Sequence, residues 1–183
     1  MSTKVVTGKV RFSYPQIFSS DKKTQDGKTK YTLCILIPKS DKKTIAKINQ
    51  AVKEATQQGI SEKWGGKKPG NLHLPLHDGN EKAIEHPEFE DHYYLNASTT
   101  IKPGIVDRDR IEILNPEEIY GGCYGRVSIN FFPFKHELGN AGVAAGLNNV
   151  QKLEDGERLG GNRATAEQDF DDGFTDDYDE LGI

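Results

Sequence analysis

Alternating apolar and polar positions mark the first forty residues of the chain. Within residues 4 to 18, Val10, Phe12 and Tyr14 fall on one side and the residues between them fall on the other. This two-residue period is typical of a strand. A second alternating segment spans residues 28 to 38, and Asp26-Gly27 before it is a turn signal. Together the two segments predict a long β-hairpin.

The spacing of apolar residues changes after residue 40. Ile45, Ile48, Val52 and Ala55 recur every three or four positions, which is the stripe of an amphipathic helix. Ser40 is a favoured N-cap residue and Gly59 a favoured stop. The sequence therefore predicts a helix from residue 41 to about residue 58.

The rest of the chain has short strand-like pieces separated by glycine- and proline-rich turns. Residues 61–92 are irregular, and strand character returns in five places: residues 92–101, 104–106, 112–114, 124–134 and 143–152. Five or six strands around one helix predict a mainly β fold. We expect an OB-fold-like Greek-key barrel with one main α-helix inserted after the second strand.

The charge is divided unevenly along the chain. Eight of the 28 acidic residues lie in residues 167–183, which contain no Lys or Arg. The remaining 24 basic and 20 acidic residues give residues 1–166 a net charge of +4. A basic body with an acidic end is typical of nucleic-acid-binding proteins. We expect a folded domain over residues 1–153 and a disordered acidic C-terminal tail over residues 154–183.

Basic and aromatic residues alternate at several points in the body. Single-stranded DNA offers charged phosphates and exposed base faces, so a protein that binds it needs cations and stacking rings. The candidate phosphate contacts are Lys9, Arg11, Lys30, Lys67, Lys68 and Arg126, and the candidate stacking rings are Tyr14, Tyr31, Trp64 and Tyr94. Trp64 is expected to be exposed, because its loop is rich in glycine and lysine.

The acidic tail also contains aromatic residues at regular spacing. Phe170, Phe174 and Tyr178 recur every four residues among carboxylates. Such a segment can dock on a partner protein, imitate DNA in the protein's own groove, or serve only to keep the chain soluble. The predicted docking and regulatory residues are Asp169, Phe170, Asp171, Asp172, Phe174, Asp176, Asp177, Tyr178, Asp179 and Glu180.

Enzymatic and metal-binding patterns are weak. His73 and His77 are four residues apart, but Pro75 prevents a regular helix between them, and no paired Cys spacing accompanies them. Asp107 and Asp109 could hold Mg²⁺ in a nuclease, although Arg108 and Arg110 alternate with them. The glycines form no nucleotide-binding loop. We therefore expect no catalysis, no cofactor and no metal.

Four segments and the tail carry a resemblance to a known family. These segments are GKVRFSYPQIF (8–18), YLNASTT with KPGIVD (94–100 and 102–107), YGGCYGRV (120–127) and GVAAGLNNVQ (142–151). In this order they resemble the single-stranded-DNA-binding proteins of tailed bacteriophages. The resemblance implies an OB-fold barrel that coats single strands during phage replication and recombination. It also implies a tail that contacts replication enzymes and regulates access of DNA.

The sequence thus predicts sequence-tolerant binding and protection of single-stranded DNA in the cytoplasm of an infected bacterial host. The expected partners are single-stranded DNA and, through the tail, phage or host replication and recombination proteins; a homodimer is compatible with the sequence. No secretory signal or membrane span is expected, and Cys34 and Cys123 are expected to be reduced and buried. Two alternatives stay open: a phage assembly or interaction module that acts through its tail, and a Mg²⁺-dependent nuclease.

Overall fold

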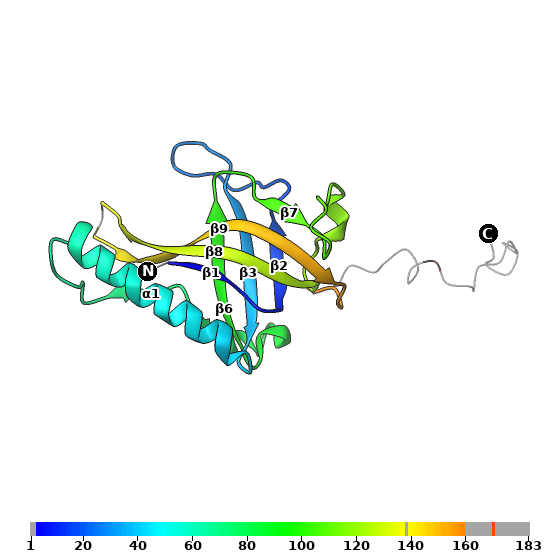
Figure 1. The fold of residues 1–183 in the computed structure, drawn as a ribbon, viewed down its shortest axis with the longest axis horizontal. Coiled ribbons are helices and arrows are strands. Elements are labelled where there is room, and N and C mark those ends of the chain that lie inside the picture. Colours follow the sequence, from blue (N-terminus) through cyan, green and yellow to red (C-terminus); the bar gives the residue numbers. More distant parts are fainter. Residues whose placement is uncertain (1–2, 138, 160–169, 171–183) are drawn as a thin grey trace, which may run out of the picture.

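Strands dominate the computed structural model, which describes residues 3–137, 139–159 and 170 (Figure 1). Within these residues the strands are β1 (Lys4–Val6), β2 (Val10–Gln16), β3 (Tyr31–Pro38), β4 (Leu72–His73), β5 (His77–Asp78), β6 (His92–Thr99), β7 (Gly104–Val106), β8 (Tyr124–Lys135) and β9 (Ala141–Glu154). The helices are α1 (Lys42–Glu62) and the short 3₁₀ turns η1 (Gly79–Lys82), η2 (Pro87–Phe89) and η3 (Pro116–Glu118).

Five of these strands close into a barrel in the order β2, β3, β6, β9, β8 and back to β2. All the neighbouring pairs are antiparallel except β6 and β9, which run parallel. This is the five-stranded barrel of an oligonucleotide-binding fold. The predicted fold is confirmed, including a long helix that follows the second strand of the barrel. The short strands β1, β4, β5 and β7 pair with barrel strands at their edges.

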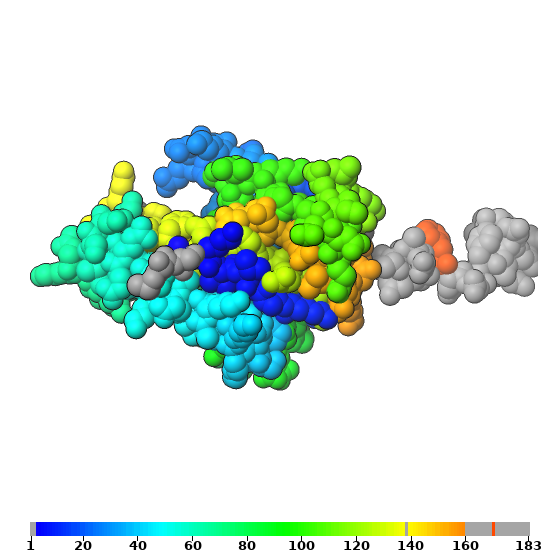
Figure 2. Space-filling model, viewed as in Figure 1, coloured from blue at the N-terminus to red at the C-terminus, as the bar shows by residue number. Residues whose placement is uncertain are grey.

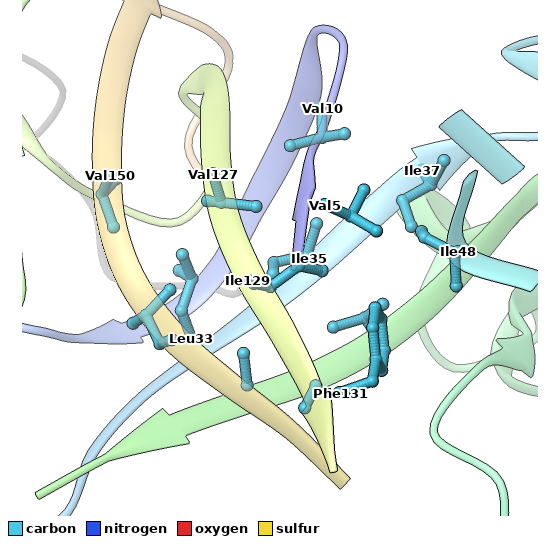
Figure 3. Packing of buried hydrophobic residues seen from close by; sticks show 14 of the residues in the cluster. Val5, Val10, Leu33, Ile35, Ile37, Ile48, Val127, Ile129, Phe131 and Val150 are labelled. Carbon is cyan, nitrogen blue, oxygen red and sulfur yellow. The ribbon is translucent and has the colours of Figure 1, made fainter. Parts of the chain in front are cut away.

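The core lies inside the barrel, under α1 (Figure 3). Val127, Ile129 and Phe131 of β8 are buried at alternate positions, as are Leu33, Ile35 and Ile37 of β3. The other face of β3 is also covered, because Cys34 and Leu36 pack against Phe89 and Tyr94, while Cys123 lies in the main core. The two cysteines are free thiols, as predicted. Burial raises the pKa of Cys34 to about 11, so its thiol is neutral at physiological pH.

The predicted limits of the helix are wrong at both ends. Asp41, not Ser40, is the N-cap, because its carboxylate accepts a hydrogen bond from the Thr44 amide at 3.1 Å. At the other end the helix continues past Gly59 to Glu62. A Cβ at Gly59 would lie 2.6 Å from the Trp64 ring, so this glycine makes room for the ring and does not end the helix.

The first predicted strand is divided into two. The break falls at Gly8, whose amide donates to Thr44 Oγ1 at 2.9 Å and thereby ties the β1–β2 turn to α1. The predicted alternation also fails at the end of β2, where the pairing with β3 shifts between Ser13 and Gln16. Ser13 is buried there, whereas Tyr14 has φ 47° and is exposed. The bulge re-aims the tyrosine, as such irregularities commonly do.

Gly125 lies where the barrel closes, at a position that has no room for a Cβ atom. It pairs with Val10 of β2 and with Lys152 of β9. A Cβ at this position would overlap the Gln151 carbonyl oxygen and the Phe12 ring. We expect Gly125→Ala to lower the free energy of unfolding by about 1–3 kcal/mol, measured by chemical denaturation.

Gly70 provides the matched control for this substitution. A Cβ at Gly70 meets no atom within 4 Å. Gly70→Ala should therefore leave the free energy of unfolding unchanged or raise it slightly. Equal stabilities of the two variants would contradict the tight closure of the barrel at Gly125.

Candidate functional site

A groove of about 360 Å³ lies on the outer surface of the barrel. Its walls come from the β2–β3 loop (residues 17–30), the end of β6, and the facing parts of β8 and β9. The lining residues are Thr24, Lys30, Ser98, Thr99, Thr100, Asn130, Phe132, Gly146, Leu147 and Asn148. In Figure 2 the blue β2–β3 loop projects from the surface, above the yellow and orange surface of the β8–β9 hairpin. OB folds bind oligonucleotides on the face of strands two and three, together with the loops that join strands one to two and four to five. The groove includes the first of these loops and the end of the third barrel strand, β6.

The register of the barrel decides which side chains face this groove. On β8 the buried Phe131 alternates with Asn130 and Phe132, which point outward. The parallel pairing of β6 with β9 places Ser98 opposite Gly146. A Cβ at Gly146 would come within 2.9 Å of Asn130 Oδ1 and 3.4 Å of the Phe132 ring. Glycine at this position thus leaves room for both outward side chains.

The groove combines a cation, an aromatic ring and neutral hydrogen-bonding groups. Lys30 is exposed, and none of the ion pairs formed within the described residues includes it. The Phe132 ring is 42% exposed. The surrounding hydroxyl and amide side chains supply donors and acceptors. A polyanion with flat, stackable groups is the kind of ligand that such a surface can hold.

Lys30 is the one predicted binding residue that lines this groove. Tyr31 follows it and is half-buried at the start of β3, where it pairs with Thr99. Lys67 and Lys68 are exposed in the loop after α1. The other predicted binding residues lie outside the groove. Three are cations bonded within the protein, one is an exposed ring beside another pocket, and two are buried rings.

Lys9, Arg11 and Arg126 gather near the junction of β2 and β8, where the protein already holds them. Lys9 pairs with Glu154 and lies 5.0 Å above the Tyr124 ring. Arg11 donates to the Gly122 carbonyl at 3.1 Å and to the Glu157 carbonyl at 2.7 Å. Arg126 donates to the Thr7 carbonyl at 3.0 Å. These cations brace the fold, whereas the ion pairs among the described residues leave Lys30 available to a ligand.

The bonds of Arg11 belong to a larger set of contacts that holds residues 155–159 against the barrel. We call this set of contacts the clasp. Its centre is Tyr120, whose hydroxyl donates to Asp155 at 2.9 Å and accepts from the Gly156 amide at 3.1 Å. Arg158 lies 4.4 Å above the same ring. The Lys152 ammonium, at 2.6 Å, and the Tyr120 hydroxyl lower the pKa of Asp155. These contacts continue past the predicted domain boundary at residue 153 as far as Leu159, whose amide bonds Gly121.

Tyr14 is exposed, as a stacking residue must be, but it lies away from the groove. It borders a separate pocket of about 170 Å³ with Ser13, Pro15, Glu88, Gly121 and Leu159. Its ring meets His86 edge-on, with the ring centroids 6.4 Å apart. The structure therefore does not bring Tyr14 together with Lys30.

Two of the predicted stacking rings are buried. The expected exposure of Trp64 is wrong: it is 7% exposed, and its indole N–H donates to the Phe134 carbonyl at 3.1 Å. Glycines and lysines surround it in the sequence, but its apolar neighbours come from α1 and β8. Tyr94 is equally buried, since its ring packs on Phe89 at 5.2 Å and on His77 at 5.1 Å.

Phe132 is the aromatic residue of the groove, and sequence reasoning did not select it. The signal for it was present, because Phe132 and Phe134 share one strand face and Lys135 and His136 follow them. The sequence Phe131-Phe132-Pro133-Phe134, however, does not show which ring faces the core. The structure decides this by burying Phe131 and exposing Phe132.

Most of the predicted tail residues lie outside the described residues. These are Asp169, Asp171, Asp172, Phe174, Asp176, Asp177, Tyr178, Asp179 and Glu180. Phe170 is described and is exposed.

The predicted metal candidates have other surroundings in the structure. No group of three or more His, Cys, Asp or Glu side chains within the described residues could hold a metal ion. Asp107 instead shapes a turn, since one carboxylate oxygen accepts from the amides of Asp109 and Ile111. In the same part of the chain, no helix has both the length and the apolar character that crossing a membrane requires.

Comparison with known families settles the class of protein. The model of the family described as Enterobacter phage Enc34, ssDNA-binding protein, matches residues 3–181. The chain belongs to this family. The predicted resemblance to phage single-stranded-DNA-binding proteins is thereby confirmed.

Individual relatives agree with this assignment. Protein p50 of Acyrthosiphon pisum secondary endosymbiont phage 1 is 28% identical over 179 residues, which cover 92% of this chain and 93% of that protein. The bacteriophage Enc34 single-stranded DNA-binding protein, solved in complex with ssDNA, is 26% identical with a TM-score of 0.74, over 86% of this chain and 90% of that one. The bacteriophage T7 protein gp2.5 shares the fold, with a TM-score of 0.64 at 17% identity over 96% and 99% of the two chains.

The clasp can be tested by removing one hydroxyl group. Tyr120→Phe deletes the acceptor of the Gly156 amide and the donor to Asp155 but keeps the ring. A hydrogen bond of this kind contributes about 1 kcal/mol, so we expect about fivefold faster amide exchange at Gly156. Tyr124→Phe is the control. Lys9 and Arg11 lie over the Tyr124 ring, which the substitution keeps, and the clasp as defined does not include the Tyr124 hydroxyl. Unchanged exchange in Tyr120→Phe would show that other contacts hold the clasp.

Proposed function

We propose that this chain binds single-stranded DNA without catalysis, through the groove that contains Lys30 and Phe132. Its work would be to coat and protect single strands during phage DNA replication and recombination, in the cytoplasm of the infected bacterium. One observation carries the proposal: Lys30, which has no ion-pair partner among the described residues, and the exposed Phe132 ring share a groove beside the loop between the first two barrel strands, one of the loops with which OB folds bind oligonucleotides. Membership of a family of single-stranded-DNA-binding proteins supports it.

Each part of the groove has a distinct role in this proposal. Lys30 meets a phosphate and Phe132 provides a face on which a base stacks. Ser98 and Asn148 offer hydrogen bonds to sugar and base atoms. Because every base has a flat face and every nucleotide has a phosphate, stacking and charge bind all sequences with similar strength. The binding is therefore sequence-tolerant and weakens as salt is added.

The acidic tail has a regulatory role in the same proposal. Its eight carboxylates, without a single Lys or Arg in residues 167–183, resemble the charge of a DNA strand and compete for the same cations. Phe170, Phe174 and Tyr178 supply rings through which replication and recombination proteins dock. When a DNA strand occupies the groove, it displaces the tail, which can then bind these partners.

One titration separates this function from the two rival functions. A labelled dT oligomer is mixed with the full chain, with and without Mg²⁺. A binding protein shifts the oligomer in both conditions and leaves it intact. An interaction module that acts through its tail alone gives no shift, and a nuclease that uses Asp107 and Asp109 shortens the oligomer when Mg²⁺ is present.

The groove residues make separable contributions that mutation can measure. We expect Phe132→Ala to weaken dT binding by about 1–3 kcal/mol, the range for one base–aromatic stack. Lys30→Gln should reduce the slope of log affinity against log salt by about 0.7, the value for one phosphate contact on a single strand. Fluorescence anisotropy over a salt series measures both quantities.

Ile84→Ala is the control for the loss of an exposed apolar side chain. Ile84 is 97% exposed and lies between η1 and η2, away from the groove. Its replacement should leave both affinity and salt slope as in the unaltered chain. The groove is excluded as the DNA site if Phe132→Ala and Lys30→Gln behave like this control.

Removal of residues 167–183 tests the role of the tail. Eight negative charges leave with the segment, so repulsion of DNA falls and any competition for the groove ends. We expect tighter dT binding, with the largest gain at low salt, where charges are least screened. Affinity that does not change at low salt would rule out competition by the tail, though not partner docking.

A further inference from the structure

The loop that follows α1 lies beside the tip of the β8–β9 hairpin. We call residues 63–70 the lysine loop, because it contains Lys63, Lys67 and Lys68, all exposed. Two contacts fix its place: the Trp64 indole donates to the Phe134 carbonyl, and β4, just after the loop, pairs with Ala141 and Gly142 of β9. In Figure 1 the end of α1 and the tip of the hairpin lie at the same end of the molecule.

A row of side chains leads from the groove toward this tip. Asn130, Phe132 and Phe134 occupy alternate positions on β8 and therefore share its outer face. The Phe134 ring also contacts His136, just beyond the strand, with 4.9 Å between the ring centroids. Asn130 and Phe132 belong to the groove itself. The outer face of β8 thus continues the groove as a partly exposed aromatic surface.

Trp64 determines the position of the lysine loop. Its ring fills the space that Gly59 leaves open beside Pro133 of β8, since a Cβ at Gly59 would lie within 2.8 Å of both residues. Gly65 and Gly66 have φ 67° and 87°, a left-handed conformation that glycine adopts freely. The chain therefore turns away directly after the buried ring and carries the lysines into solvent.

The lysines of the loop have no competing charge partner in the described part of the chain. The ion pairs among the described residues join Lys9 to Glu154, Lys39 to Asp78, His86 to Glu88 and Lys152 to Asp155. None of them includes Lys63, Lys67 or Lys68. Glu62, the nearest carboxylate in the sequence, instead accepts from the Gln58 amide. An arriving phosphate would not have to displace a protein carboxylate.

We infer that a single strand of DNA longer than the groove continues along Phe132, Phe134 and His136 to the lysine loop, where Lys67 and Lys68 bind its phosphates. Trp64 is a positioning residue in this path, because it holds the loop at the end of the hairpin without touching the strand. This inference rests on the proposed function and extends it. It names a second contact that only long strands reach.

The test compares a short dT oligomer of about four nucleotides with a long one of about twelve, within the range covered by one OB fold. The double variant Lys67→Gln/Lys68→Gln should bind the short oligomer as the unaltered chain does. For the long oligomer the salt slope should fall by about 1.4, which is two phosphate contacts on a single strand. The factor by which the double variant binds the long oligomer more weakly than the unaltered chain should therefore be roughly sevenfold smaller at about 200 mM salt than at about 50 mM.

Lys42→Gln/Lys43→Gln is the matched control. It removes two exposed lysines from the opposite end of α1, so it makes the same change in net charge. It should leave the slope for the long oligomer unchanged. A slope that falls equally in both double variants would overturn the inference, since general attraction would then explain the effect.

Trp64→Phe tests the positioning role. Phenylalanine keeps an apolar ring but cannot donate to the Phe134 carbonyl. We expect a selective loss for the long oligomer, in a variant whose melting temperature and short-oligomer affinity show that the barrel is intact. Equal losses for both lengths would overturn the positioning role.

The outcomes also separate this inference from the proposed function. If Phe132→Ala weakens binding and Lys67→Gln/Lys68→Gln leaves the slope for the long oligomer unchanged, the path to the lysine loop is wrong and the groove stands. If Phe132→Ala binds both oligomers normally, the groove itself is wrong.

Discussion

The pairing of β8 with strands on both of its edges is the constraint on which this molecule depends. β2 and β1 pair along one edge and β9 along the other, so β8 closes the barrel and has no freedom of register. Side chains alternate along a strand, and a slip of one residue would exchange its two faces. The register that buries Ile129 and Phe131 is therefore the same register that turns Asn130 and Phe132 into the groove.

The cations of the folded part fall into two groups that exposure alone does not distinguish. Lys9 is as accessible as many free lysines, yet it is paired with Glu154, and Arg11 is bonded to two carbonyl oxygens. A phosphate would have to replace these bonds, which cancels much of the gain from binding. Lys30 and the lysine loop have no such partner within the described residues, so their full interaction is available to a ligand. The hydrogen bonds a cation already makes, more than its charge, decide whether it can serve a binding site.

The strands, the helix and the fold class follow from local periodicity, which is why residues 31–38 and the stripe of Ile48 and Ala55 could be placed from sequence. The site depends on contacts between distant residues. Lys9 meets Glu154, which lies 145 positions away, and no local pattern reports this pairing. Trp64 stands among lysines in the sequence, yet it is buried, with its ring in the space that Gly59 leaves open. The bulge that turns Tyr14 outward likewise arises from pairing with β3, which alternation along β2 does not reveal.

The clasp bears on how the tail could compete with DNA. Groove residue Asn148 and the last residue of β9, Glu154, are six positions apart, or about 20 Å along a strand. From Leu159, where the clasp ends, eight residues lead to the first carboxylate of the tail at Glu167; fully extended, they span at most about 28 Å. Glu167 can therefore lie at most about 28 Å from Leu159, and the carboxylates that follow it in the sequence can reach farther. The effective concentration of a tethered competitor depends on how the length of its tether compares with the distance to its target. In the proposed function, the clasp at residues 155–159 therefore sets the point from which the tail reaches the groove, and with it the strength of the tail as a competitor of DNA.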